Sequence, residues 1–250
     1  MCLILFAWKK HASYDLIVTA NRDEFYNRPT QSAGLWPNYP DLLAGKDLTA
    51  GGTWMGVTKT GKFAALTNYR DIAKISDNAP TRGDLTKDYL TQNVEPKTYL
   101  EKVKSAQIPY NGFNLLVGDN DSLWYYNNIN HEIKSLEPGI YGLSNALLND
   151  PWPKVETGKQ KLSQLLQYDH LTSSNLLGII QDKTIAPDDQ LPSTGVPIDW
   201  ERALSAMYIT MENYGTRCST TLLKKGTSTN FTEKIYAHLG QKEDQVEFIL

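Results

Sequence analysis

The sequence predicts an α+β fold in which antiparallel sheets are covered by helices. Three observations support this prediction. Apolar runs rich in β-branched and aromatic residues occur in pairs across short polar turns, which is typical of hairpins. Helical segments come in two groups between these pairs, and strands and helices do not alternate regularly, which disfavours a parallel Rossmann-type sheet. Two antiparallel sheets stacked face to face would accommodate this order.

Paired strands dominate the first third of the chain and return after each group of helices. The run CLILFAW at 2–8 and the run YDLIVTA at 14–20 flank the polar turn KKHAS, so they form the first expected hairpin. Hairpins are also expected at 52–68 and 113–129, turning at KTGK and GDND, with further strands at 131–136, 139–145, 219–225, 231–237 and 245–250.

Four segments are predicted to be helical. Pro96 stands at a helix start that tolerates proline, and Thr172 or Ser173 can cap another. The expected helices are 82–92, 96–106, 153–167 and 173–183. The segment 187–200 is rich in Pro, Asp and Gly, so a long irregular loop is expected there.

Composition and charge limit the class of protein. The 250 residues are 40% hydrophobic and 21% charged, and no linker divides them, so one globular domain over 1–250 is expected. The net charge is −3 and no basic stripe occurs, so nucleic acid is not an expected partner. The first apolar run is too short to cross a bilayer and lacks the flanks of a secretory signal. We therefore expect a cytoplasmic protein with no transmembrane segment.

Familiar ligand-binding motifs are incomplete. The stretch 56–63 nearly matches a phosphate-binding loop, but Phe63 replaces the hydroxyl residue that would bind magnesium. Asp119 and Asp121 have the spacing of a calcium loop without its glycine and closing glutamate. The four histidines are scattered, and Cys218 is expected to be a buried small apolar residue. We therefore expect no metal and no cofactor.

Polar clusters rich in Asn and Arg interrupt the apolar strands where each is expected to end. Strand ends commonly present catalytic groups, and Asn side chains can donate N–H groups to an oxyanion. Taken alone, each of Asn21, Asn68, Asn145 and Asn149 is better explained as an ordinary turn residue. Together with Cys2, a soft nucleophile beside the amino terminus, they indicate a site.

Five blocks of the sequence resemble the NRDE-domain family, also called the transport-and-Golgi-organisation 2 family. They are TANRDEF with the downstream Arg28-Pro29, LLAGKDLTAGGTWMGVTKTGKFAALTNYR, GLSNALLNDPWPKV, LPSTGVPIDWERALS and YGTRCSTTLL, in order along essentially the whole chain. The resemblance implies the fold of the N-terminal-nucleophile hydrolases, with penicillin V acylases and bile salt hydrolases as relatives. That fold has four layers, α–β–β–α, with two stacked antiparallel sheets.

The resemblance also implies that Cys2 is the nucleophile once Met1 is removed. The ordinary pKa of an α-amine is about 8 and that of a thiol about 8.5, so the free α-amine of Cys2 would act as general base for its own thiol. The thiolate would attack the carbonyl of a small acyl amide or thioester, and water would then release the acyl group. No separate histidine is needed in this chemistry.

Further site residues follow from the resemblance position by position. Arg22 and Asp23 correspond by residue type to an Arg and an Asp that the acylases space three apart, whereas here they are adjacent. Adjacent strand residues point to opposite faces, so one of the two is expected to face away. Asn68 resembles the oxyanion Asn of the acylases, and Asn145 resembles a second Asn of their site. Supporting or substrate-binding roles are expected for Asn21, Glu24, Arg202 and Arg217.

The expected function is therefore hydrolysis of an amide or thioester bond of an acyl compound. The alternative is a binding or trafficking protein for haem, acyl-CoA or lipid on the same scaffold, which the altered Arg–Asp spacing favours. A purely structural role ranks third. Several aromatic residues near the polar clusters either line an apolar acyl pocket or pack in the core; they are Phe25, Tyr26, Trp54, Tyr69 and Trp152.

Overall fold

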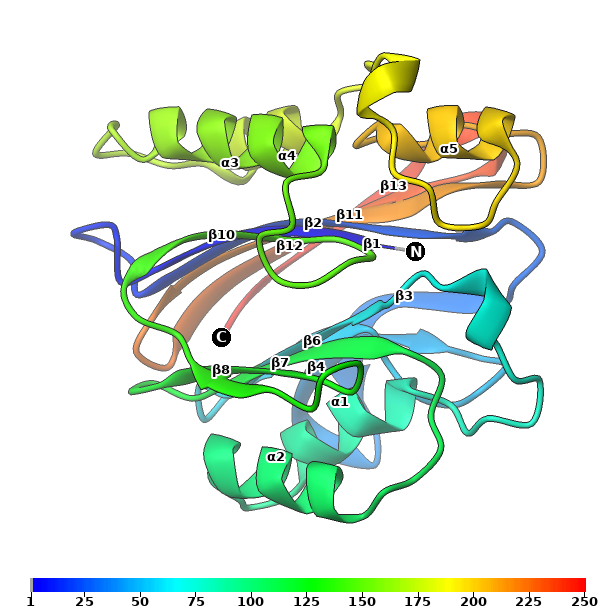
Figure 1. The fold of residues 1–250 in the computed structure, drawn as a ribbon. Helices are drawn as coiled ribbons and strands as arrows, with labels where there is room; N and C mark the ends of the chain where they lie inside the picture. Colours follow the sequence, from blue (N-terminus) through cyan, green and yellow to red (C-terminus); the bar gives the residue numbers. More distant parts are fainter. Residues whose placement is uncertain (1) are drawn as a thin grey trace.

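Two antiparallel sheets lie face to face between two layers of helices in the computed structural model, which describes residues 2–250 (Figure 1). Met1, whose removal the expected chemistry requires, lies outside the described residues. The six-stranded sheet has the order β10 (Gly139–Leu143), β1 (Cys2–Trp8), β2 (Leu16–Phe25), β11 (Tyr214–Lys225), β12 (Ser228–Tyr236) and β13 (Lys242–Ile249). The seven-stranded sheet has the order β3 (Thr30–Trp36), β4 (Tyr39–Asp47), β5 (Met55–Thr58), β6 (Phe63–Asn68), β7 (Phe113–Gly118), β8 (Leu123–Asn127) and β9 (Ile133–Ser135).

Helices cover the outer face of each sheet (Figure 1). The six-stranded sheet carries α3 (Pro153–Leu165), α4 (Ser173–Ile180) and α5 (Ile198–Ser205), and the seven-stranded sheet carries α1 (Gly83–Thr91) and α2 (Pro96–Ser105). Short 3₁₀ helices lie at η1 (Ile72–Lys74), η2 (Asp188–Gln190) and η3 (His238–Gly240). The layer order is α–β–β–α, which confirms the fold expected from the sequence.

Strand alternation distributes the buried side chains among the layers. Along β1, Ile4 and Phe6 pack between the two sheets, whereas Leu3 and Leu5 pack against the helices of the six-stranded sheet. A separate cluster that includes Leu115 fills the space between the seven-stranded sheet and α1 and α2. A residue's position along a strand therefore fixes the layer into which its side chain points.

Several expected boundaries are wrong. β2 runs on to Phe25, so the polar residues 21–24 lie inside a strand and not after it. They remain in the strand because β11 continues to pair with this part of β2. β11 begins at Tyr214 rather than at residue 219, and α5 begins inside the segment expected to be a loop. β3 and β4 have no counterpart among the expected elements, because polar residues and Pro40 weaken their alternating apolar pattern.

The register of three neighbouring strands places Cys2, Arg22 and Cys218 in one row. Cys2 of β1 pairs with Arg22 of β2, and Arg22 pairs with Cys218 of β11. Side chains in one row point to the same face of a sheet. That face is turned toward the other sheet, because Ala20, two residues before Arg22, belongs to the core between the sheets. Cys2 and Arg22 therefore face the space between the sheets.

Asn21 points to the opposite face and ties β2 to the helix layer. Its Nδ2 donates to the carbonyls of Ile180 and Met207, both at 2.8 Å, and its Oδ1 accepts from Ser219 Oγ at 2.5 Å. Asn21 is buried. Both amide protons are used, so Asn21 anchors the strand that carries the site.

We expect Asn21→Ala to lower the free energy of unfolding by about 3 kcal/mol or more. Two carbonyls and a hydroxyl would lose a buried partner, and each unsatisfied buried group costs about 1–3 kcal/mol. Asn230→Ala, at an exposed position of β12, serves as the control and should change the free energy by less than about 0.5 kcal/mol. Urea unfolding followed by tryptophan fluorescence measures both values. Equal stability of the two variants would contradict the anchoring role.

Candidate active site

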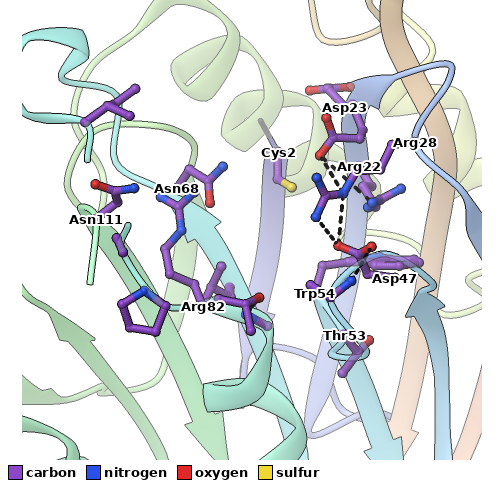
Figure 2. Close-up of a pocket in the computed structure, with 18 of the residues that line it drawn as sticks. Cys2, Arg22, Asp23, Arg28, Asp47, Thr53, Trp54, Asn68, Arg82 and Asn111 are labelled. Atoms are coloured by element: carbon purple, nitrogen blue, oxygen red, sulfur yellow. Dashed lines mark hydrogen bonds and ion pairs between the residues drawn. The ribbon is translucent and has the colours of Figure 1, made fainter. Parts of the chain in front are cut away.

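A cavity of about 480 Å³ opens at the beginning of β1, with walls contributed by both sheets and by the segment that leads into α1. Cys2 lines this cavity. Figure 2 shows its thiol between two groups of polar side chains, with Asn68 and Arg82 on one side and Arg22 and Asp47 on the other. A cavity of this size can hold a small organic ligand. We call it the cysteine chamber.

Cys2 has a free thiol, and the residue as a whole is half-buried. Burial raises its pKa above the ordinary value, and the carboxylate of Asp23 raises it further. The guanidinium of Arg22 and the backbone N–H of Asp23 lower the pKa, but they do not outweigh burial. The thiol is therefore protonated at neutral pH and needs a base before it can act as a nucleophile.

Arg22 is held in place by several contacts. Its guanidinium carbon lies 4.3 Å from the centroid of the Trp54 ring, and its Nη1 donates to Thr30 Oγ1 at 2.9 Å. A carboxylate oxygen of Glu24 lies 4.0 Å from Arg22 Nη2. A planar guanidinium can stack on an indole and still donate from its edge, so this position suits arginine better than lysine.

An ion pair closes the same side of the chamber. Arg28 Nη2 and Nε donate to Asp47 Oδ2 at 2.7 and 3.0 Å. Asp47 Oδ1 accepts the backbone N–H groups of Thr49 and Ala50. Burial opposes ionisation of Asp47, yet these hydrogen bonds leave its pKa below the ordinary value. The pair therefore stays charged at neutral pH and joins the loop after β2 to the end of β4.

Asp23 faces the helix layer, opposite to Arg22. Its Oδ1 accepts from Thr216 Oγ1 at 2.8 Å, and its backbone carbonyl accepts from Tyr214. Burial raises the pKa of this carboxyl group. The charge of the buried Lys154 favours the ionised form of Asp23, and burial lowers the pKa of Lys154 itself to about 8. Asp23 comes one position after the Cys2–Arg22 pair, so it lies beside the amino end of Cys2.

Asn68 and Asn145 belong together, but only Asn68 lines the chamber. Asn68 ends β6, and its side chain points toward Cys2 (Figure 2). Asn145 is buried and donates from Nδ2 to the carbonyl of Asn68 at 2.8 Å. The neighbouring Ser144 Oγ donates to the carbonyl of Cys2 at 3.1 Å. The segment after β10 thus positions both Cys2 and Asn68.

Two expected site residues lie outside the chamber. Arg202 of α5 is exposed and pairs with Asp188 at 2.6 Å and Asp199 at 2.7 Å. Arg217 lies at the register shift of β11, and its Nη1 donates to the backbone carbonyls of the segment 25–28. The geometry brings neither guanidinium to Cys2. The hydrogen bonds of Arg217 hold the turn that carries Arg28.

Sequence reasoning missed other residues of the chamber. Arg28 and Asp47 both fall within the blocks that carry the family resemblance. That resemblance is the one feature of the sequence that could have indicated them as site residues. Arg82 and Asn111 also line the chamber. Arg82 precedes α1 and Asn111 precedes β7, and neither stands in an apolar run that would draw attention to it. Of the five aromatic residues considered, Trp54 lines the chamber, whereas Tyr26 and Trp152 do not.

Residues 2–250 contain no group of three or more His, Cys, Asp or Glu side chains placed to hold a metal ion. None of the helices in this part of the chain is long and apolar enough to cross a membrane.

Comparison with solved structures identifies the class of fold. An N-acylethanolamine-hydrolyzing acid amidase orthologue from Caenorhabditis elegans aligns with a TM-score of 0.52 over 89% of this chain and 92% of its own, at 12% sequence identity. Together with the α–β–β–α layers, this similarity defines an N-terminal-nucleophile hydrolase fold.

Sequence comparison identifies the family within that class. The family model for Transport and Golgi organisation 2 matches residues 1–238, and the chain belongs to this family. The Transport and Golgi organization protein 2 homolog of Homo sapiens is 36% identical over 94% of this chain and 92% of its own length. The Drosophila melanogaster Transport and Golgi organization protein 2 is 29% identical over 89% of this chain and 87% of its own length. The resemblance seen in the sequence is thereby confirmed.

We expect iodoacetamide to alkylate Cys2 slowly at neutral pH in a chain that retains Met1. The rate should rise through a midpoint above about pH 8.5, the ordinary thiol value, because burial disfavours the thiolate. Rates measured by intact mass across the alkaline range give this midpoint. Cys2→Ala should abolish the label, because Cys218 is 4% exposed. A midpoint below the ordinary value would contradict the raised pKa.

Proposed function

We propose that this protein is an N-terminal-cysteine hydrolase that cleaves an amide or thioester bond of a small acyl compound. One observation carries the proposal: the thiol of Cys2 lies in a cavity beside the side-chain amide of Asn68. A nucleophile and an oxyanion donor next to each other in one cavity are two of the groups that acyl transfer requires.

The missing base is the α-amine that removal of Met1 would expose on Cys2. No histidine lines the chamber among the described residues, and the thiol itself is protonated at neutral pH. An α-amine has an ordinary pKa of about 8 and can accept the thiol proton. Asp23 lies beside the amino end of Cys2, so its carboxylate would hold the resulting α-ammonium.

Two steps complete the proposed reaction. First, Sγ of Cys2 bonds to the acyl carbonyl carbon, and Asn68 donates to the oxyanion. The carbon–nitrogen bond then breaks, and the leaving amine takes the proton from the α-ammonium. Second, the same amine deprotonates a water molecule that attacks the thioester. The carbon–sulfur bond breaks, the acid leaves, and the thiol regains its proton. With a thioester substrate the leaving group is a thiol.

We expect Cys2→Ala to abolish hydrolysis of a decanoyl anilide and Asn68→Ala to lower kcat by about 10²–10³-fold, the usual cost of removing one oxyanion donor. Cys218→Ala, which removes the buried cysteine that does not line the chamber, should retain activity. Steady-state kinetics on protein whose N-terminus has been defined by mass measures these effects.

Insertion of a lysine between Met1 and Cys2 provides a second test. It leaves every chamber side chain in place but keeps the nitrogen of Cys2 in a peptide bond, so hydrolysis should be lost. Turnover that survives either this insertion or Cys2→Ala would refute the proposal.

A ligand-binding protein on the same scaffold is the second candidate. The adjacency of Arg22 and Asp23 favours it, because their side chains leave β2 on opposite faces and do not reproduce the Arg–Asp spacing of the acylases. This candidate includes the binding of haem, acyl-CoA or lipid expected from the sequence. Equal ligand affinity in wild type and Cys2→Ala, with no turnover of any acyl compound, would support the ligand-binding function and contradict the hydrolase.

A further inference from the structure

A second chamber of about 570 Å³ adjoins the cysteine chamber. The two share a wall formed by residues that line both, among them Asn68, Arg82, Glu24 and Ile75. Much of the remaining wall comes from the loop after β6, and α5 contributes Trp200. No sequence motif indicated this space, because its lining comes from segments far apart in the chain.

The second chamber is lined by large apolar side chains that remain exposed. Phe25 is 46% exposed, Ile72 44%, Ile75 55% and Ile129 40%. Trp200 contributes a further aromatic surface. Several exposed apolar residues gathered around one concavity indicate a site for an apolar ligand, since scattered exposure would need no explanation. We call this space the apolar chamber.

Arg82 is the cation at the boundary. Its Nη1 donates to the backbone carbonyl of Gly112 at 2.9 Å, and none of the ion pairs among residues 2–250 includes it. Figure 2 shows its side chain reaching up the wall of the cysteine chamber to Asn68. The remaining donors of the guanidinium are therefore available to an anion in the cavity.

The other cations around the two chambers have carboxylate neighbours. Arg28 is paired with Asp47, and Arg70 with Glu201 at 3.0 Å. Lys74 is paired with Asp71 at 3.0 Å. Glu24 lies 4.0 Å from Arg22 and 3.8 Å from Arg28. Of the charged residues that border both chambers, Glu24 lies within 4.0 Å of two arginines, whereas Arg82 forms no ion pair with a carboxylate among residues 2–250.

We propose that the apolar chamber binds the acyl chain of an N-acyl amino acid, with Arg82 pairing with the carboxylate of the amino acid. This inference rests on the proposed function, because it assigns the substrate class of the same site. The chain would pass Asn68 into the apolar chamber, so the amide carbonyl comes beside Asn68 and Cys2. The amino-acid part remains in the cysteine chamber, where Arg82 meets the carboxylate a few bonds from the scissile carbon.

Binding to the Cys2→Ala variant tests the ligand class without turnover. We expect N-decanoylglycine to bind about ten-fold or more tightly than N-decanoylethanolamine, which has the same chain and no charge, as measured by isothermal titration calorimetry. A ten-fold difference in affinity is what one hydrogen bond to a charged group ordinarily contributes. A second substitution, Arg82→Gln, should abolish the preference, and Arg82→Lys should retain part of it.

The apolar chamber is tested by chain length and by a matched pair of isoleucines. N-acetylglycine should bind at least about 100-fold more weakly than N-decanoylglycine, because each buried methylene contributes about 0.8 kcal/mol. Ile129→Asn should weaken both decanoyl compounds equally. Ile185→Asn, at an isoleucine that is 54% exposed outside both chambers, should change neither.

The outcomes separate this inference from the proposed function. Equal affinity for the two decanoyl compounds, or a preference that survives Arg82→Gln, would overturn the inference even if Cys2-dependent hydrolysis is found. Binding that depends on Arg82, with no hydrolysis of any acyl compound by the protein with a free Cys2, would overturn the proposed hydrolase and support the ligand class alone.

Discussion

Alternation along one strand determines which groups can reach the thiol. Because β2 runs unbroken to Phe25, Arg22 points into the space between the sheets, while Asn21 and Asp23 point to the helices. Pairing with β1 then puts Cys2 in the same row as Arg22. A shift of one residue in this register would exchange the two faces and put a buried anchor in the cavity. The bonds of Asn21 to the helix layer hold the register, so the site depends on a residue that does not line it.

Charged side chains that connect the two sheets form part of the wall of the cysteine chamber. The Arg28–Asp47 pair links the turn after β2 to β4, and Arg22 stacks on Trp54 from the opposite sheet. Each guanidinium is constrained by its partners, so it can shape the space without moving to meet a ligand. Arg82, anchored by one carbonyl, differs in this respect. We therefore assign structure to the paired arginines and recognition to Arg82.

The sequence predicts the layers better than the site. Apolar hairpins and helix starts such as Pro96 are local signals, so the elements around them appear where expected. In the sequence, the polar residues 21–24 are typical of a strand end, because their buried partners, among them Ile180 and Ser219, lie more than 150 residues away in the chain. Family resemblance located Cys2 and Asn68. Arg82 lines the cysteine chamber and Arg202 does not. This difference depends on how segments far apart in the chain come together, which no local sequence pattern encodes.

The proposed ligand binding and the proposed catalysis depend on different groups. Arg82 and the apolar chamber are formed without any change at the amino terminus, whereas the raised pKa keeps the thiol of Cys2 protonated until a base is supplied. If the α-amine is that base, release of Met1 turns a binding protein into an enzyme without moving a side chain. The two candidate functions are then two states of one site, and the identity of the N-terminal residue decides between them. On the proposed function, the groups that would bind the ligand are thus independent of the group that would start the chemistry.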